Sequence, residues 1–119
     1  MEQSRMGKET AKKLTLACEV LEKEFGNAMT AMKVYDVVNQ PNHYYFKIRF
    51  IAYEYFCVVV QYDMGSTCSY IEGGRTPDSL LAKDYRDHSE IDYETFLHET
   101  NEEIRLRIPD KYLKEKGWL

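Results

Sequence analysis

The sequence has few of the residues that mark a compartment or a cross-linked site. Cysteine occurs only at Cys18, Cys57 and Cys68 among 119 residues, never in Cys-x-x-Cys spacing. An odd number of thiols without that spacing argues against a disulfide framework and favours a reducing compartment, so we predict a cytoplasmic protein. No apolar run reaches the roughly 18 residues that cross a bilayer. The start, MEQSRMGKET, has no apolar signal region. We therefore expect no membrane association.

Catalytic and cofactor motifs are also missing. The chain has no G-x-x-x-x-G-K loop, no G-x-G-x-x-G loop and no nucleophile elbow. The run HETNE at 98–102 comes closest to the zinc motif H-E-x-x-H, but its fifth position is Glu102. A third ligand could come only from elsewhere, with His43 and His88 as the other histidines. We interpret the run as a solvated acidic helix face, and we predict no catalytic residue, no metal ligand and no cofactor.

Length and hydrophobic periodicity predict one globular domain over residues 1–119 that begins with a helix. Hydrophobic residues make up 44% and charged residues 30% of the chain, which is typical of a folded domain. The segment 8–25 has apolar residues at three- and four-residue spacing, which indicates an amphipathic helix. These are Ala11, Leu14, Cys18, Leu21 and Phe25. Gly26 is a plausible end of the helix, and we expect residues 1–7 to be disordered.

The middle of the chain changes to the two-residue period of β-strands. Segments 30–38, 44–51, 55–62 and 68–71 are the predicted strands, the last one the weakest. In 44–51 apolar residues alternate with Tyr45, Lys47 and Arg49, which indicates a half-buried strand. In contrast, 55–62 is apolar on both faces and fits a central strand. Short links predict an antiparallel meander of three to four strands.

The second half is predicted to be helical. Thr76, Pro77 and Asp78 form a helix-start pattern for 77–87. Glycines at 73 and 74 with Arg75 precede it; we interpret them as a turn rather than an anion site, because Asp78 already occupies the positive helix end.

A second helix is expected to follow a capping box formed by Ser89 and Asp92. Its inner stripe is Tyr93, Phe96, Leu97, Thr100 and Ile104. The segment 103–108 fits either helix or an edge strand, and 109–116 a last short helix before Gly117. The predicted fold class is therefore α+β, with an N-terminal helix, the meander, and two or three C-terminal helices packed on the sheet.

One segment is more acidic than the chain that contains it. Residues 84–103 hold eight carboxylates and one arginine, a formal charge of −7, whereas the whole chain carries −4. A concentrated field of one sign concerns partners rather than fold. It also disfavours nucleic acid as a partner, because such binding requires a basic surface. We select seven of these carboxylates as partner-binding candidates: Asp84, Asp87, Glu90, Asp92, Glu94, Glu99 and Glu102.

Tyrosine is unusually frequent, with 10 of 119 residues. Aromatic residues suit the pleated surfaces of strands, so many of them are expected in the core. Tyr53, Glu54 and Tyr55 lie at a predicted hairpin tip, where core packing is least expected, and we add them to the partner-binding candidates. For Tyr53 the core and the interface interpretations are equally weighted, and Tyr45 is a weaker interface candidate. Exposed tyrosines supply rigid, amphipathic contact area at protein interfaces.

These features favour a small non-enzymatic binding protein that recognises a basic partner. Carboxylates would accelerate association and complement the partner's charge, and tyrosines would anchor it. In size, acidity and lack of catalytic motifs the chain resembles bacterial immunity proteins and phage-type inhibitors. That resemblance implies an inhibitor that neutralises a basic protein such as a nuclease toxin; no family motif accompanies it.

Two alternatives remain open at this point. The first is a small-ligand domain or enzyme with an aromatic pocket between sheet and helices, which predicts that His98, Arg75 or Arg49 points into a cavity. The second is a homo-oligomeric subunit that pairs through a sheet edge. In that case Lys47 and Arg49, or Arg105 with Arg107 if 103–108 is a strand, would guard the edge.

Overall fold

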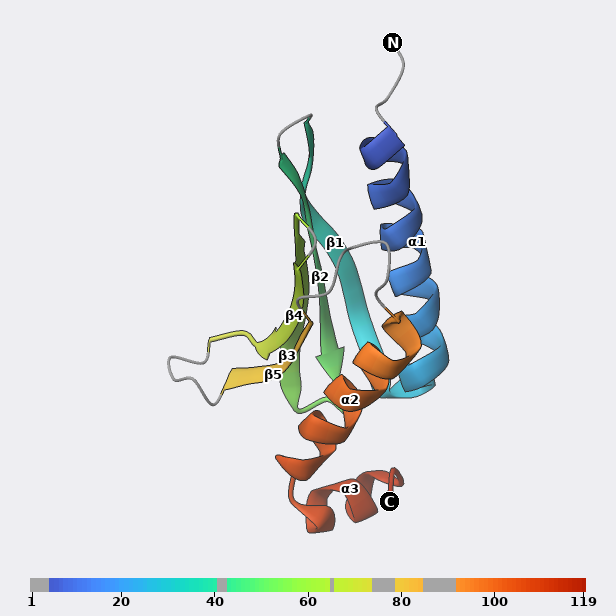
Figure 1. The fold of residues 1–119 in the computed structure, drawn as a ribbon. Helices are drawn as coiled ribbons and strands as arrows, with labels where there is room; N and C mark the ends of the chain where they lie inside the picture. Colours follow the sequence, from blue (N-terminus) through green and yellow to red (C-terminus); the bar gives the residue numbers. More distant parts are fainter. Residues whose placement is uncertain (1–4, 41–42, 65, 74–78, 85–91) are drawn as a thin grey trace.

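The computed structural model shows an α+β fold, as predicted, with five strands rather than three to four (Figure 1). It describes residues 5–40, 43–64, 66–73, 79–84 and 92–119, and for residues 5–9 and 84 the backbone alone. The elements in chain order are α1 (Arg5–Phe25), the 3-10 helix η1 (Gly26–Ala28), β1 (Met29–Gln40), β2 (His43–Ala52), β3 (Phe56–Asp63), β4 (Ser66–Ile71), β5 (Leu80–Asp84), α2 (Tyr93–Leu106) and α3 (Asp110–Lys116). None of the helices in these ranges is both long and apolar enough to cross a membrane.

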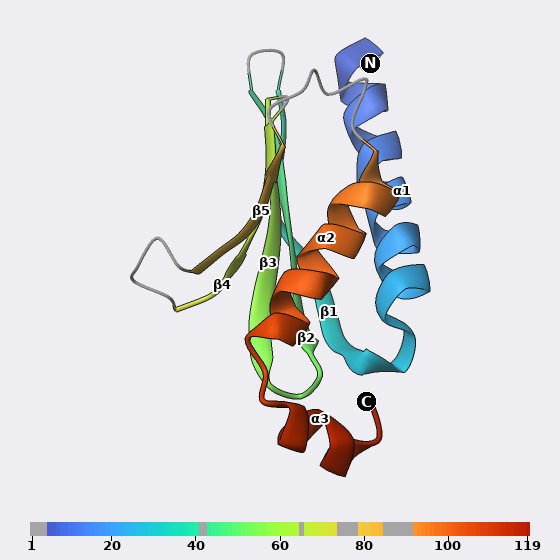
Figure 2. The ribbon, with the colours of Figure 1, turned by 60° about the horizontal axis from the view of Figure 1, so that its bottom comes forward.

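The five strands form one antiparallel meander in the order β1-β2-β3-β4-β5. Helices α1 and α2 lie side by side on one face of this sheet, and α3 lies at the end where the β2–β3 hairpin turns (Figures 1 and 2). No described helix covers the opposite face of the sheet. The molecule is thus a two-layer structure with one helix-covered and one uncovered sheet face.

The predicted alternation in the second strand is confirmed. Tyr44, Phe46, Ile48 and Phe50 of β2 are all buried against the helices. Strand β3 has the central position that its apolar character predicted, because Val58, Val59 and Val60 are buried on both of its faces. Aromatic contacts fill the space between sheet and helices: the rings of Phe46 and Tyr62 stack 5.1 Å apart, and those of Phe25 and Phe50 lie 5.0 Å apart.

Both long helices bury one stripe, as expected from their periodicity. In α2 the five predicted inner residues are buried, and Asn101 is buried with them. In α1 the buried stripe is slightly rotated from the predicted one: Leu21 and Phe25 are buried, Leu14 and Cys18 are partly buried, and Ala11 is exposed. The helix starts at Arg5, so residues 5–7 are helical rather than disordered, whereas residues 1–4 lie outside the described part.

The predicted helix at 77–87 is wrong. Residues Leu80–Asp84 form β5, which pairs with β4 in antiparallel register. Residues 74–78 and 85–91 lie outside the described part, which includes Ser89 of the predicted capping box. The cap of α2 is Asp92 itself: its carboxylate accepts hydrogen bonds from the Thr95 backbone N–H at 3.2 Å and from the Thr95 hydroxyl at 2.8 Å. This is the usual role of an aspartate at a helix start.

The C-terminal elements follow the sequence pattern. The ambiguous segment 103–108 is helical through Leu106, so Arg105 and Arg107 do not guard a strand edge. Lys47 and Arg49 do not do so either, because β2 lies inside the sheet. Helix α3 ends at Gly117, whose φ of 83° is the left-handed conformation that favours glycine. The Trp118 N–H then donates to the Leu113 carbonyl at 2.9 Å, as in the predicted C-cap.

Candidate functional site

The described part of the acidic segment lies on the surface of α2. Asp92, Glu94, Glu99 and Glu102 are all exposed. The side chain of Asp84, and all of Asp87 and Glu90, lie outside the described residues. Asp92 and α2 together hold five carboxylates and one arginine, a formal charge of −4, which equals the net charge of the whole chain. The chain's excess negative charge can therefore be placed on one helix.

Three- and four-residue spacing aligns the outermost residues of α2 into one stripe. This outward stripe consists of Thr95, Glu99, Glu102 and Leu106, all exposed. It lies opposite the buried stripe of the same helix, so it faces away from the sheet. Within the described part of the chain, Glu99 forms no ion pair. The stripe is acidic in its middle and apolar at its C-terminal end.

Ion pairs hold the side of α2 that adjoins α1. Lys23 lies 3.4 Å from Glu94. The two ring nitrogens of His98 lie 2.9 Å from a carboxylate oxygen of Glu24 and 2.8 Å from one of Glu102. The hydrogen bond with Glu24 and the negative charges of both carboxylates raise the pKa of His98. His98 in its charged form therefore links α2 to α1 through Glu24, while Glu102 is a second partner within α2.

The sequence placed His98 and Glu102 on one helix face, and the structure agrees. Both imidazole nitrogens already face carboxylate oxygens, so the ring is arranged as a link between helices rather than as a metal ligand. His43 lies at the start of β2, with one ring nitrogen 4.0 Å from Asp63. His88 is outside the described residues. Among the residues that the structure does describe, no group of three or more His, Cys, Asp or Glu could hold a metal ion.

The three predicted interface residues at the hairpin tip differ in exposure. Tyr53 is only 5% exposed, and its hydroxyl donates to the Asn101 side-chain oxygen at 2.6 Å. Tyr53 is therefore a core residue, and of its two equally weighted interpretations the structure agrees with core packing rather than with an exposed interface position. The reason is tertiary: the turn reaches α2 and Trp118, whose ring lies 5.3 Å from the Tyr53 ring. Local sequence contains no signal for that contact.

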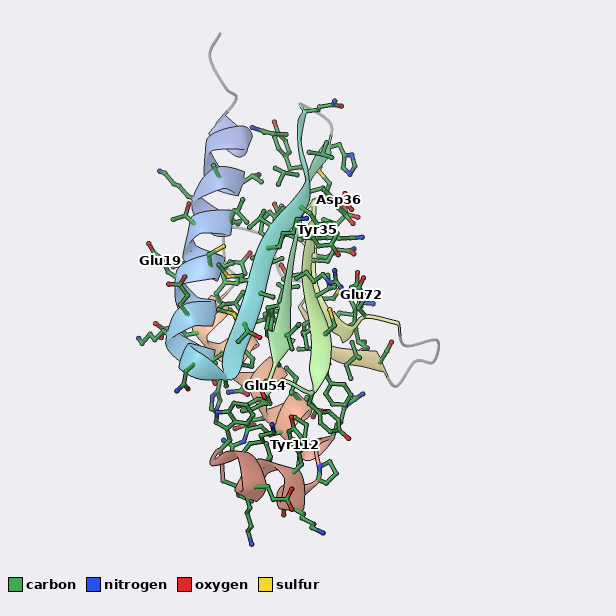
Figure 3. The ribbon with its side chains drawn as sticks, turned by 180° about the vertical axis from the view of Figure 1, so that it is seen from behind. Glu19, Tyr35, Asp36, Glu54, Glu72 and Tyr112 are labelled. Carbon is green, nitrogen blue, oxygen red and sulfur yellow. The ribbon has the colours of Figure 1, made fainter. Side chains whose placement is uncertain are left out.

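The other two tip residues are exposed and lean on α3. Tyr55 is 44% exposed and its ring lies 4.9 Å from that of Tyr112. Glu54 lies 3.3 Å from Lys116, and the Tyr112 hydroxyl donates to the Glu54 carbonyl at 3.3 Å. Figure 3 shows Glu54 and Tyr112 together at this end of the molecule. The tip thus presents one exposed tyrosine and one carboxylate, both in contact with the last helix.

The uncovered sheet face holds a tyrosine cluster that the sequence did not reveal. The Lys47 ammonium lies 5.8 Å from the centre of the Tyr35 ring and 5.7 Å from that of the Tyr45 ring, which are cation–π distances. Asp36 lies 3.8 Å from the same ammonium. Tyr35 and Asp36 are visible on this face in Figure 3. Strand register brings these residues together, and register cannot be read from one strand alone.

Beside that cluster, Arg49, Cys57 and Glu72 form a compact polar group. The Arg49 Nε lies 2.6 Å from a Glu72 oxygen and 2.9 Å from the Cys57 sulfur, which in turn lies 3.0 Å from that carboxylate. Burial and the carboxylate raise the pKa of Cys57. The thiol is therefore held in its protonated, less nucleophilic form, and the group is suited to fixing strands together rather than to nucleophilic catalysis.

The alternative of a small-ligand domain predicts that His98, Arg75 or Arg49 points into a cavity, and the structure gives the positions of two of them. His98 and Arg49 have side chains that are 60% and 52% exposed, and Arg49 belongs to the uncovered face. Arg75 lies outside the described residues. Neither described residue points into a cavity between sheet and helices, where the aromatic core instead packs. Comparison of the chain with protein-family models, curated proteins and solved structures found no match.

Proposed function

We propose that the protein is a non-enzymatic binding protein that recognises a basic macromolecular partner, of inhibitor or immunity type, through the outward stripe of α2. The observation that carries this proposal is that Asp92 and α2 hold a formal charge of −4, with four of the carboxylates, Asp92, Glu94, Glu99 and Glu102, on exposed positions. A field of this kind steers a basic partner into contact and selects against acidic ones.

The carboxylates of α2 differ in how far they are already paired. Glu94 and Glu102 are partly compensated by Lys23 and His98, respectively. Glu99 has no such neighbour in the described chain, so the strongest uncompensated field lies in the middle of the stripe. A lysine or arginine of the partner would gain most there, since it would not have to displace an existing ion pair.

The decisive experiment is a pull-down from the native host lysate at low and moderate salt, with wild type and two charge-reversal variants. We expect wild type to retain a basic protein that salt releases, because screening weakens interactions between exposed charges. Glu99→Lys with Glu102→Lys should lose that protein. The matched control, Glu19→Lys with Glu22→Lys, changes the net charge equally on exposed positions of α1 and should keep it.

With the retained protein in hand, association rates make the test quantitative. The α2 double variant should associate at least about tenfold more slowly at low salt, and the difference should shrink as salt is added. Retention by the α2 variant equal to that of wild type, or equal loss in both variants, would contradict recognition through this stripe.

A further inference from the structure

A surface hollow of about 370 Å³ lies between the end of α2 and α3, next to the outward stripe. Its lining residues are Glu102, Arg105, Leu106, Asp110, Leu113 and Leu119. Leu113 is buried and forms an apolar floor, whereas Leu106 is 79% exposed and Leu119 is 56% exposed. The hollow therefore offers an apolar surface at the point where the acidic stripe ends. Figure 2 shows how α3 lies beyond the C-terminal end of α2.

Leu106 is not required by the helix at this position. It occupies the last residue of α2 on the solvent side, where a charged residue would form helix equally well. Two exposed leucines and a buried third one line the same hollow, which is a more specific feature than one isolated surface leucine.

The charges at the rim determine what could fill the hollow. Glu102 and Asp110 are exposed at its edge, and Glu99 precedes them along the stripe. The single base, Arg105, directs one guanidinium nitrogen to the Trp118 carbonyl at 3.2 Å, so part of its donor capacity is already used. An occupant with an apolar side chain and adjacent positive charge would match both the floor and the rim.

We propose that this hollow is the anchor site for a segment of the partner in which a leucine-sized apolar side chain is flanked by lysine or arginine. The inference rests on the proposed function, because the basic residues would lie along Glu99 and Glu102. The apolar side chain would pack on Leu113 between Leu106 and Leu119. The carboxylates of the stripe would orient the basic residues of the segment, and the hollow would fix the position of its apolar side chain along α2.

The test uses two fluorescent probe peptides, one of lysine and leucine and one with every leucine replaced by serine. Anisotropy titrations compare wild type with Leu106→Ala, which removes exposed atoms and should leave folding intact. Leu16→Ala is the control, since Leu16 is 45% exposed on α1 and lines another hollow, of about 310 Å³.

We expect wild type to bind the lysine–leucine peptide more tightly than the lysine–serine peptide. Leu106→Ala should weaken the affinity for the lysine–leucine peptide about tenfold, a factor that corresponds to partial burial of one leucine. The lysine–serine peptide should bind wild type and Leu106→Ala with equal affinity. The control Leu16→Ala should bind each peptide as tightly as wild type does. Equal affinity of wild type and Leu106→Ala for the lysine–leucine peptide would overturn the anchor site.

The two proposals fail in different ways. If Glu99→Lys with Glu102→Lys weakens both peptides while Leu106→Ala changes nothing, only the anchor site is wrong. If neither peptide binds wild type, the anchor site is wrong, and the pull-down decides the proposed function separately. Sedimentation shows whether a second copy occupies the hollow: a dimer that Leu106→Ala dissociates would overturn the anchor proposal in favour of self-association.

Discussion

The burial of Tyr53 leads to the sharpest prediction, because its hydroxyl group has a defined partner in the core. In Tyr53→Phe the ring contacts with Phe25, at 6.2 Å, and with Trp118, at 5.3 Å, can be kept. The hydrogen bond to the Asn101 side-chain oxygen, at 2.6 Å, is lost. Asn101 is only 9% exposed, so water cannot easily replace that donor.

The magnitude follows from what the substitution leaves behind. A buried acceptor without its donor costs about 1–3 kcal/mol. Asn101 keeps its other hydrogen bond, from its amide nitrogen to Glu24 at 3.1 Å, so we expect the lower part of that range, about 1–2 kcal/mol. For a domain of 119 residues that is a decrease in Tm of roughly 4–8 °C.

Urea and thermal unfolding of the two phenylalanine variants at the hairpin tip test this reasoning. Tyr55→Phe is the matched control, because Tyr55 is 44% exposed and its hydroxyl has no hydrogen-bond partner in the described chain. It should unfold within about 0.5 kcal/mol of wild type. The reasoning is refuted if Tyr53→Phe is as stable as wild type, or if both variants lose equal stability.

Two further predictions concern the turn and the link between the helices. Glu54 has a φ of 53° in the turn between β2 and β3, which the Tyr55 N–H closes by donating to the Ala52 carbonyl. Glu54→Gly should therefore raise the free energy of unfolding by about 0.5–1 kcal/mol despite the loss of the Lys116 pair. Urea unfolding that shows Glu54→Gly to be less stable than wild type would contradict this. The pKa of His98 is raised in the folded state by Glu24 and Glu102, so its stabilising effect is complete below the unfolded pKa and is lost as pH rises through the folded one. The Tm difference between wild type and His98→Gln should therefore be larger at pH 5.5 than at pH 8.5, and a difference that does not vary with pH would refute the charged bridge.

The features that could be predicted from the sequence are those that depend on residues close together in the chain. The alternation in β2 and the inner stripe of α2 depend on period alone, and both are confirmed. Strand β5 was missed because Thr76 and Pro77 are a strong local helix-start signal. The pairing of Leu80–Asp84 with β4 is a tertiary effect, and it prevails over local preference.

In the candidate site, too, local features could be predicted from the sequence and contacts between distant residues could not. Exposure of Glu99 and Glu102 follows from their positions opposite the buried stripe, and periodicity predicts it. The burial of Tyr53 depends on Asn101, which lies 48 residues further along the chain. The Tyr35–Lys47 contact depends on the register between β1 and β2, which contains two one-residue shifts. Such distant contacts leave no periodic signal in one sequence.

The order of the elements along the chain has a consequence for folding. Every strand pairs with its neighbour in sequence, so the sheet can grow hairpin by hairpin. The contact between α1 and α2 is different: Glu24 meets His98 across 74 residues. At the usual rates of synthesis, that separation corresponds to roughly 4–15 s. Until α2 has been made, the apolar side of the nascent sheet lacks the second helix that covers it.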